Sequence, residues 1–399
     1  MQDQDWLSER GAHLKKRALE ERHVVPPAST SVAYQLENSQ RQFQLDEPSR
    51  AMLEENLACA EGAECAVTFA SGMGAISAAL CNCATAGEHI LSHNLLDGAT
   101  CSLLKNWLPR FGIETSGADF TQLESARRHL RPNTRVLYFE SPVNLDLRLI
   151  DIAAVAEWAR EINRERRPEQ RLWMIVDNTL ATPYGQRPLR LGADLVVSSL
   201  TKNIGGFGAD LGGMVAGPSV FENSWMSFRK DFGGLLSPRN AWHFLVYGLP
   251  TLPVRFRQQQ ESAMKLARFL ERHPCIEKVA YPGLESFPQR ELARRQMQDY
   301  DGRFAPGTMI HFRLREPVPN TGENARKFID YLANHAYAIT MAASLGQIRT
   351  LVEHPYSMSG APLDPGGIRL SVGLEKADDL IHELSEALET VFQPENHRP

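Results

Sequence analysis

The 399-residue chain lacks several features that would assign it to a specialised class of protein. No apolar run approaches the roughly 18 residues that a membrane-spanning helix requires. Basic and acidic residues nearly balance, at 43 and 48, so the net charge of −5 gives no reason to expect a nucleic acid or a membrane as a partner. The first residues show neither the basic nor the apolar segment of a secretory signal. We therefore expect a cytoplasmic protein.

Cysteine is scarce, and internal repeats and low-complexity tracts are absent. The six cysteines lie at positions 59, 65, 81, 83, 101 and 275. Cys81 and Cys83 could form a metal or redox pair, but no second Cys/His pair lies at the spacing of a zinc site. Buried free thiols are the better interpretation, and we predict no metal site.

The remaining composition is that of an ordinary globular enzyme, with 43% apolar and 23% charged residues. The length allows two or three packed units. Residues 1–60 are polar with isolated apolar positions, and they do not form a core alone. We expect a large unit over 61–250 and a smaller one over 251–399, because Pro250 and Pro253 precede a charged helix at this point.

Short apolar strands alternate with amphipathic helices through the large unit. The strands are expected near 65–69, 89–92, 135–139, 172–176 and 195–197. One intervening helix begins after Asp151, and a capping box predicts another after Thr121. A helix is also expected over 103–111. This alternation predicts an α/β fold with a mostly parallel sheet covered on both faces.

The smaller unit shows a different pattern. Ile310, Phe312 and Leu314 alternate as in a strand, and residues 325–332 and 380–391 have helical apolar spacing. These elements predict a smaller C-terminal α+β domain.

The stretch 193–206 is the most informative in the chain. A buried strand, Leu195 to Val197, runs into Ser199, Thr201 and Lys202 and then into glycines. Ligands bind at strand ends in α/β folds. A lysine beside an apolar strand is costly to bury unless it is neutralised or used covalently, and hydroxyl groups of this kind can bind a phosphate.

Two further segments complete this pattern. Asp177 ends the preceding strand, and Ser71, Gly72 and Met73 form a small-residue turn between a strand and a helix. Such a turn binds phosphate, because its free N–H groups and the helix dipole point at the anion. A strand-end carboxylate, a strand-end lysine and a phosphate-binding turn suit pyridoxal 5′-phosphate (PLP). Lys202 would form the Schiff base and Asp177 would pair with the pyridinium nitrogen. The alternatives are a surface lysine and an aspartate that caps a turn.

These motifs resemble the Cys/Met-metabolism (trans-sulfuration) family of PLP-dependent enzymes. The matching segments are Val-Asp-Asn-Thr at 176–179, Pro-Leu-Arg-Leu-Gly-Ala-Asp at 188–194 and Ser-Leu-Thr-Lys at 199–202, and matches recur from about 48 to 390. The resemblance implies the fold of type I PLP enzymes and a homo-oligomer, a dimer of dimers. It also implies that residues 1–60 form an arm that packs on a neighbouring subunit. A loosely attached terminus is the alternative.

The resemblance also assigns roles to individual residues. Gly72, Met73, Ser199 and Thr201 would bind the phosphate together with Ser71, and Asn144 would lie near the ring hydroxyl. Arg369 matches the arginine that binds the substrate carboxylate, a role suited to a permanently charged fork of donors. Ser344 matches a residue beside the same carboxylate.

The chain departs from the family at several places. Asp97 occupies the position of a tyrosine that stacks on the cofactor ring and assists the leaving group. The neighbour-subunit Tyr-x-Arg pair is missing from the stretch 43–49, Phe207 replaces a histidine, and the loop between Pro355 and Arg369 looks short. The PLP core is therefore retained while the leaving-group machinery differs.

Three reactions share this chemistry: β-elimination, γ-elimination and γ-replacement. Ala343 occupies a position where several cystathionine-handling members have a glutamate, and the segment 344–355 is closer to methionine γ-lyases and homoserine-ester sulfhydrylases. We expect a lyase that removes a sulfur, ester or halogen substituent from a small amino acid. A γ-replacing transferase is the first alternative, and a non-catalytic PLP-fold binding or assembly protein is the second.

Overall fold

The computed structural model describes residues 25, 48–144, 146–358 and 364–392. Most of the expected N-terminal arm lies outside these residues. The strands are β1 (Cys65–Phe69), β2 (His89–His93), β3 (Glu114–Ala118), β4 (Thr134–Glu140), β5 (Trp173–Asp177), β6 (Leu195–Ser199), β7 (Gly213–Gly217), β8 (Ile276–Ala280), β9 (Met309–Leu314), β10 (Ile339–Met341), β11 (Thr350–Glu353) and β12 (Gly367–Ser371). The α-helices are α2 (Pro48–Glu61), α3 (Gly72–Cys83), α4 (Gly98–Ser102), α5 (Leu123–Arg127), α6 (Ile152–Asn163), α7 (Thr182–Gly185), α8 (Glu222–Asp231), α9 (Pro238–His243), α10 (Leu249–Arg272), α11 (Arg290–Gln296), α12 (Glu323–His335), α13 (Pro355–Met358) and α14 (Ala377–Phe392).

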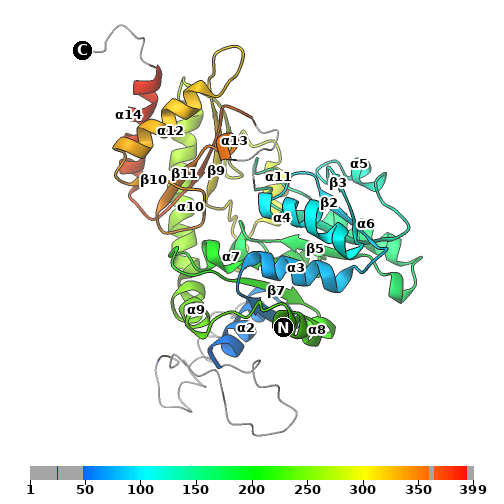
Figure 1. Ribbon diagram of the computed structural model, residues 1–399. Helices are drawn as coiled ribbons and strands as arrows, with labels where there is room; N and C mark the ends of the chain where they lie inside the picture. Colours follow the sequence, from blue (N-terminus) through cyan, green and yellow to red (C-terminus); the bar gives the residue numbers. More distant parts are fainter. Residues whose placement is uncertain (1–24, 26–47, 145, 359–363, 393–399) are drawn as a thin grey trace.

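The large sheet has seven strands in the order β1-β7-β6-β5-β4-β2-β3. The pairs from β6 to β3 are parallel, and β7 is antiparallel to both of its neighbours. Side chains alternate between the two faces: Val136 and Tyr138 join the core beneath α3 and α8, whereas Leu137 and Phe139 join the core beneath α6. This mostly parallel sheet, covered by helices on both faces, confirms the predicted α/β class (Figure 1).

The smaller sheet has five strands in the order β10-β11-β12-β9-β8. One apolar core joins it to α10, α12 and α14, and Ile310, Phe312 and Leu314 of β9 belong to that core as their alternation predicted. The 24-residue helix α10 runs from beside α7 to the smaller sheet (Figure 1). The α+β character of this domain is thus confirmed. No described helix is both long and apolar enough to cross a membrane.

Some of the local predictions, of helix caps, helix types and buried thiols, are confirmed, and others are wrong. Asp151 caps α6 as predicted, with its side chain accepting a hydrogen bond from the Ala154 N–H. Thr121 does not cap α5; its hydroxyl donates to Asp119 instead, and Gln122 occupies the cap position. Residues 103–111 are helical, but they form a π-helical turn and then a 3-10 turn instead of one α-helix. All six cysteines are free thiols as predicted, but the prediction that they are buried holds only for Cys65 and Cys83, and Cys59 on α2 is exposed.

A buried polar network lies below the strand ends of the large sheet. Glu61, the last residue of α2, is fully buried and accepts a 3.4 Å hydrogen bond from the amide of Asn178. Its second carboxylate oxygen has no hydrogen-bond partner among the described residues. Burial raises the pKa of Glu61 to about 8, although Asn178 and Arg187 act in the opposite direction. The folded protein therefore holds a proton on Glu61 that the unfolded chain loses near pH 4.5.

This proton predicts a stability that depends on pH. Because the folded-state pKa is raised, the contribution of Glu61 to stability is full below pH 4.5 and is lost as the pH rises through about 8. Replacing Glu61 with glutamine keeps an acceptor for Asn178 and removes the titration. The free energy of unfolding of the variant, relative to that of the parent, should be higher at pH 8.5 than at pH 5 by roughly 2–4 kcal/mol. The difference in Tm between the two proteins at each pH measures this change. A constant difference at both pH values would contradict the raised pKa.

Candidate active site

Three neighbouring parallel strands end at one edge of the large sheet. Glu140 ends β4, Asp177 ends β5 and Ser199 ends β6. The strand register pairs Glu140 with Asp177, and Asp177 with Val197. The helices cover the apolar faces of the sheet only up to this edge, and the strands therefore end here in polar residues. The sheet thus brings together the ends of strands from Glu140 to Ser199, which lie far apart in sequence.

The turn between β1 and α3 lies beside the end of β6. Ser71 caps α3, and its hydroxyl oxygen accepts a 3.1 Å hydrogen bond from the Gly74 N–H. A Cβ added to Gly72 would lie 3.0 Å from the Cβ of Ser199, and one added to Gly213 would collide with the carbonyl oxygen of Ser71. Glycine at these positions therefore lets the helix N-terminus approach the neighbouring strands closely. The N–H groups of Gly72 and Met73 are at this N-terminus.

Lys202 follows β6 in a backbone conformation that interrupts the helical turn, with φ −90° and ψ −134°. Its Nζ donates a 3.1 Å hydrogen bond to the hydroxyl of Ser344. Burial lowers the pKa of the Lys202 amine, and the nearby positive charge of Arg369 lowers it further. The amine therefore has a larger neutral fraction near neutral pH than an exposed lysine has.

Arg255 of α10 fixes the backbone that follows the lysine. Its guanidinium donates to the carbonyl oxygens of Asn203, Ile204 and Gly248 at 2.9–3.0 Å. Gly206 packs directly on this guanidinium, because an added Cβ would collide with it. The side chain is 5% exposed, and burial lowers the pKa of Arg255 to about 10. Three carbonyl acceptors compensate for the loss of water around the buried cation.

The Asp177 carboxylate is held by one group in the loop after β5 and by one group on the neighbouring strand β4. One carboxylate oxygen accepts a 2.9 Å bond from the Thr179 N–H, and the other accepts a 3.3 Å bond from the hydroxyl of Tyr138. Burial raises the pKa of Asp177 to about 6, against the effect of the Thr179 hydrogen bonds. No lysine, arginine or histidine of the described chain forms an ion pair with it. A bound cation at this position would favour the charged carboxylate.

Glu140 and Asp97 form a second acidic pair at the same edge. The backbone N–H of Asp97 donates a 2.7 Å hydrogen bond to Glu140. Burial raises the pKa of Glu140 well above its usual range, and the charge of Asp177 adds to this effect. Asp97 is exposed and caps α4, accepting a 2.9 Å bond from the Ala99 N–H. The two carboxyl groups therefore have different environments although they are neighbours.

Arg369 extends from β12 of the smaller sheet into the same region. Its guanidinium forms a 2.9 Å ion pair with Glu353 on the adjacent strand β11 and donates to the side-chain oxygen of Asn144. The side chain is 7% exposed. Burial raises the pKa of Glu353, and Arg369 opposes this shift. The two contacts hold the arginine in one orientation.

These groups line a cavity of about 320 Å³ between the two sheets. The lining includes nine residues that the sequence singled out, namely Ser71, Gly72, Met73, Asn144, Asp177, Ser199, Thr201, Lys202 and Arg369. Ser344 is not part of the lining and contacts the cavity through Lys202. Sequence reasoning missed Glu140, Thr179 and Glu353. Glu140 could have been found, because it ends its strand as Asp177 does.

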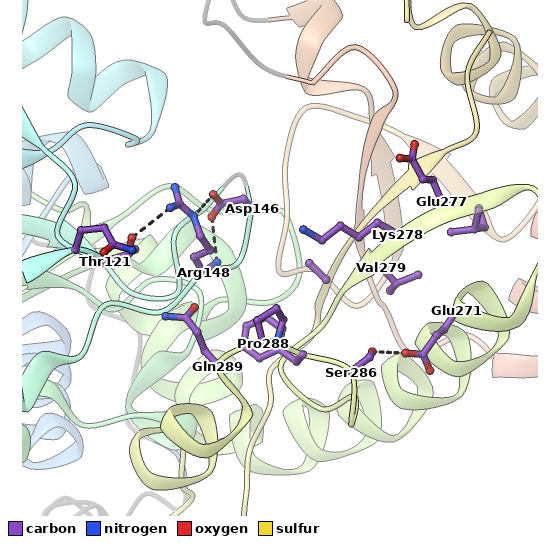
Figure 2. Close-up of a pocket in the computed structure, with 14 residues that line it drawn as sticks. Thr121, Asp146, Arg148, Glu271, Glu277, Lys278, Val279, Ser286, Pro288 and Gln289 are labelled. Carbon is purple, nitrogen blue, oxygen red and sulfur yellow. Dashed lines mark hydrogen bonds and ion pairs between the residues drawn. The ribbon is translucent and has the colours of Figure 1, made fainter. Parts of the chain in front are cut away.

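A cavity of about 470 Å³ lies elsewhere, between β8 and the large-domain loops (Figure 2). Lys278 extends into it toward Asp146 and Arg148, which pair with each other (Figure 2). Glu271 contacts only Ser286 among the residues drawn. Asp177, Lys202 and the turn at Gly72 are all absent from its lining. The cavity between the sheets is therefore the candidate active site.

The residues of this site fit PLP. The helix N-terminus at Gly72 and the hydroxyls of Ser199 and Thr201 can accommodate the phosphate. Asp177 has no cationic partner among the described residues and can take the protonated ring nitrogen, and Lys202 offers a largely desolvated amine to the aldehyde. The volume of about 320 Å³ is at the lower end of the range for small-molecule sites.

Comparisons with known proteins agree with this assignment. The family model described as "Cys/Met metabolism PLP-dependent enzyme" matches residues 12–389. An L-methionine gamma-lyase from Treponema denticola is 38% identical over 361 residues, which is 88% of this chain and 85% of the relative. An O-succinylhomoserine sulfhydrylase from Pseudomonas aeruginosa is 38% identical, covering 86% of this chain and 81% of the relative. A cystathionine gamma-lyase from Bacillus subtilis is 33% identical, covering 86% and 87%.

The resemblance seen in the motifs is thus confirmed over most of the chain, and it agrees with the fold and with the chemistry of the cavity. The chain belongs to the family of Cys/Met metabolism PLP-dependent enzymes, and pyridoxal 5′-phosphate is its cofactor.

Proposed function

We propose that the protein is a lyase that eliminates the Cγ or Cβ substituent of a small sulfur-, ester- or halogen-substituted amino acid. The observation that supports this most directly is the joint presence of Lys202 and Arg369 in one small cavity. An anchored carboxylate and a nearby amine of lowered pKa are what repeated proton transfer on one amino acid requires. The methionine gamma-lyases among the relatives support the same reaction class.

Bound PLP supplies an electron sink that stabilises negative charge at the substrate Cα and, in γ-elimination, at Cβ. In this proposal, Asp177 keeps the ring nitrogen protonated through an ionic hydrogen bond. The Tyr138 hydroxyl and the Thr179 N–H fix the carboxylate that does so. The N-terminus of α3, together with Ser199 and Thr201, would hold the phosphate.

Lys202 moves the protons in this proposal. The free amine takes a proton from Cα and, in γ-elimination, from Cβ, and it returns a proton at the end. Its lowered pKa increases the neutral fraction that can act as a base. The Ser344 hydroxyl, 3.1 Å from Nζ, orients the amine while it is free, that is, when it does not form a Schiff base.

Arg369 binds the substrate carboxylate in this proposal. Its fork of N–H groups can donate hydrogen bonds to both oxygens of a carboxylate at once. Glu353 and Asn144 already hold the guanidinium, so it is oriented before substrate binds. The small side chain of Ala343 in the lining leaves space beside the arginine for the substrate.

Replacement at Cγ is the second candidate function, favoured by the O-succinylhomoserine sulfhydrylase relative. The two reactions share their first steps and differ in whether a nucleophile adds to Cγ. The non-catalytic alternative is disfavoured, because a scaffold has no need for Lys202, Asp177 and Arg369 in one cavity. The cytoplasmic location expected from the sequence stays a prediction.

Product analysis tests the function. The holoenzyme is mixed in D₂O with amino acids that have Cβ and Cγ leaving groups, and the products are identified by NMR. A 2-oxoacid with ammonia is the expected result, with pyruvate marking β-elimination and 2-oxobutanoate marking γ-elimination. Replacing Lys202 with alanine should lower the rate at least a thousandfold. An amino acid with a new Cγ substituent, formed only with added thiol, would identify a transferase instead.

The charge of Arg369 predicts the reactivity of Lys202. In the Arg369→Gln variant, the loss of a neighbouring positive charge should raise the pKa of Lys202 toward that of an ordinary lysine. Acetylation of Lys202 in the cofactor-free protein at pH 8 should then slow by about threefold to tenfold. Peptide mass spectrometry measures this rate. The matched control is Arg313→Gln, which removes a cation of the adjacent strand β9 that pairs with Glu277 and Asp364. An equal effect of both variants would refute the prediction.

We also propose that the protein is a homo-oligomer, a dimer of dimers. Support comes from exposed apolar side chains near the active site: Phe207 and Leu211 in the loop after Lys202, and Tyr247 across from them, are 46%, 62% and 49% exposed. Phe207 and Tyr247 line a cavity of about 310 Å³ that also contains Thr201. Contiguous apolar surface of this kind is typical of an interface.

Light scattering tests the oligomer. The parent should have the mass of four chains, and the Leu211→Asp/Tyr247→Asp double variant should have a lower mass, because buried unpaired carboxylates would oppose association. Tyr337→Asp is the control, since Tyr337 is 94% exposed and lies between α12 and β10 of the smaller domain. A monomeric parent, or equal masses for the parent and the double variant, would count against this interface.

A further inference from the structure

Asp97 is a charged group in the active-site cavity that the proposed function does not use. It lines the cavity with Glu140 and Asp177. One of its oxygens caps α4 through Ala99, and its backbone N–H binds Glu140. Among the residues that the structure describes, no lysine, arginine or histidine forms an ion pair with Asp97. Asp97 and Lys202 line the same cavity of about 320 Å³, so the carboxylate lies within reach of a substrate at that lysine.

The other ionisable groups of the cavity each have an assigned partner or favour their neutral form, and Asp97 has neither. Arg369 is paired with Glu353 and is the anchor for a substrate carboxylate. Asp177 is the partner for the cofactor nitrogen. Burial raises the pKa of Glu140 well above its usual range and favours its neutral form. Lys202 is the attachment point of a cofactor whose phosphate adds negative charge. Asp97 therefore remains a carboxylate without a counter-charge.

We propose that Asp97 is a specificity-determining residue that selects α-amino acids with a positive charge at the far end of a short side chain, at the δ atom as in a sulfonium or at the ε atom as in the ammonium of ornithine. The inference rests on the proposed function, because it assumes that an amino acid binds with its carboxylate at Arg369. A substrate of this class supplies the missing counter-charge. A neutral side chain of the same shape leaves Asp97 unpaired and partly desolvated, which is unfavourable.

The leaving-group chemistry favours the same substrate class. The lining of the cavity, within the described residues, contains no tyrosine, histidine or cysteine, and its neutral carboxyl group, Glu140, is already hydrogen-bonded by the Asp97 N–H. A sulfonium, unlike a departing thiolate, does not need a proton from such a group. When the Cγ–S bond breaks, both electrons move to sulfur and a neutral sulfide leaves. With S-methylmethionine, the balanced reaction consumes one water and yields dimethyl sulfide, 2-oxobutanoate, ammonium and one proton.

Two other roles for Asp97 must be distinguished from this one. The carboxylate could serve only to cap α4, or it could contact the α-ammonium group that all amino acids share. Neither role depends on the charge of the substrate side chain. A pair of unreactive ligands that differ only in that charge therefore separates the three roles.

The experiment measures the binding of L-ornithine and L-norleucine to the holoenzyme by calorimetry. These ligands have the same number of heavy atoms and differ in a terminal ammonium or methyl group. Ornithine should bind at least about tenfold more tightly to the parent. Asp97→Asn keeps an acceptor for the cap and should abolish the preference without weakening norleucine. Asp97→Glu should restore much of it. Glu169→Gln, which removes an exposed carboxylate elsewhere, should leave it unchanged.

The outcomes separate this inference from the proposed function. Norleucine binding as tightly as ornithine to the parent overturns the role of Asp97 and leaves the amino-acid site intact. Equal weakening of both ligands by Asp97→Asn also overturns it, in favour of the cap or the α-ammonium. If neither ligand binds, the proposed function fails as well. Turnover of S-methylmethionine with release of dimethyl sulfide and one proton, at least tenfold faster than turnover of methionine, supports it.

Discussion

Desolvation of ionisable groups at one edge of a parallel sheet is the constraint on which this active site depends. The same loss of water lowers the pKa of the Lys202 amine and raises the pKa values of the Asp177 and Glu140 carboxyl groups. Each shift moves a group toward its neutral form, which makes the apo cavity less charged than its composition suggests. A bound cofactor with a cationic ring nitrogen and an anionic phosphate would reverse part of this effect.

The sequence predicted the residues whose position follows from a single strand. Asp177 and Lys202 could be placed because each follows an apolar strand, and Ser71 because it precedes a helix. The pairing of Glu353 with Arg369, and that of Tyr138 with Asp177, could not be predicted. Both depend on strand register, which involves segments far apart in the chain. Thr121 is not the cap because α5 begins one residue later than predicted, with Gln122 at the cap position, and the Thr121 hydroxyl donates to Asp119.

Asp97, where the sequence departs from the family pattern, lines the same cavity as Asp177 and Lys202. The glycine turn packs closely on β7, because a Cβ added to Gly213 would collide with Ser71 and Gly72. Asp97 lies on a short helix at the rim, where a change of side chain does not disturb the sheet. Reaction specificity can therefore change at the rim without loss of cofactor binding.

The long helix α10 contacts the parts of the site that come from both sheets. Its first turns hold Arg255 against the backbone that follows Lys202, and its later turns belong to the core that supports β12 and Arg369. One helix therefore contacts the backbone behind the proposed base and packs in the core behind the proposed substrate anchor. Because Lys202 itself follows β6 of the large sheet, the hydrogen bonds from Arg255 to Asn203 and Ile204 are the point at which α10 couples the positions of the two groups.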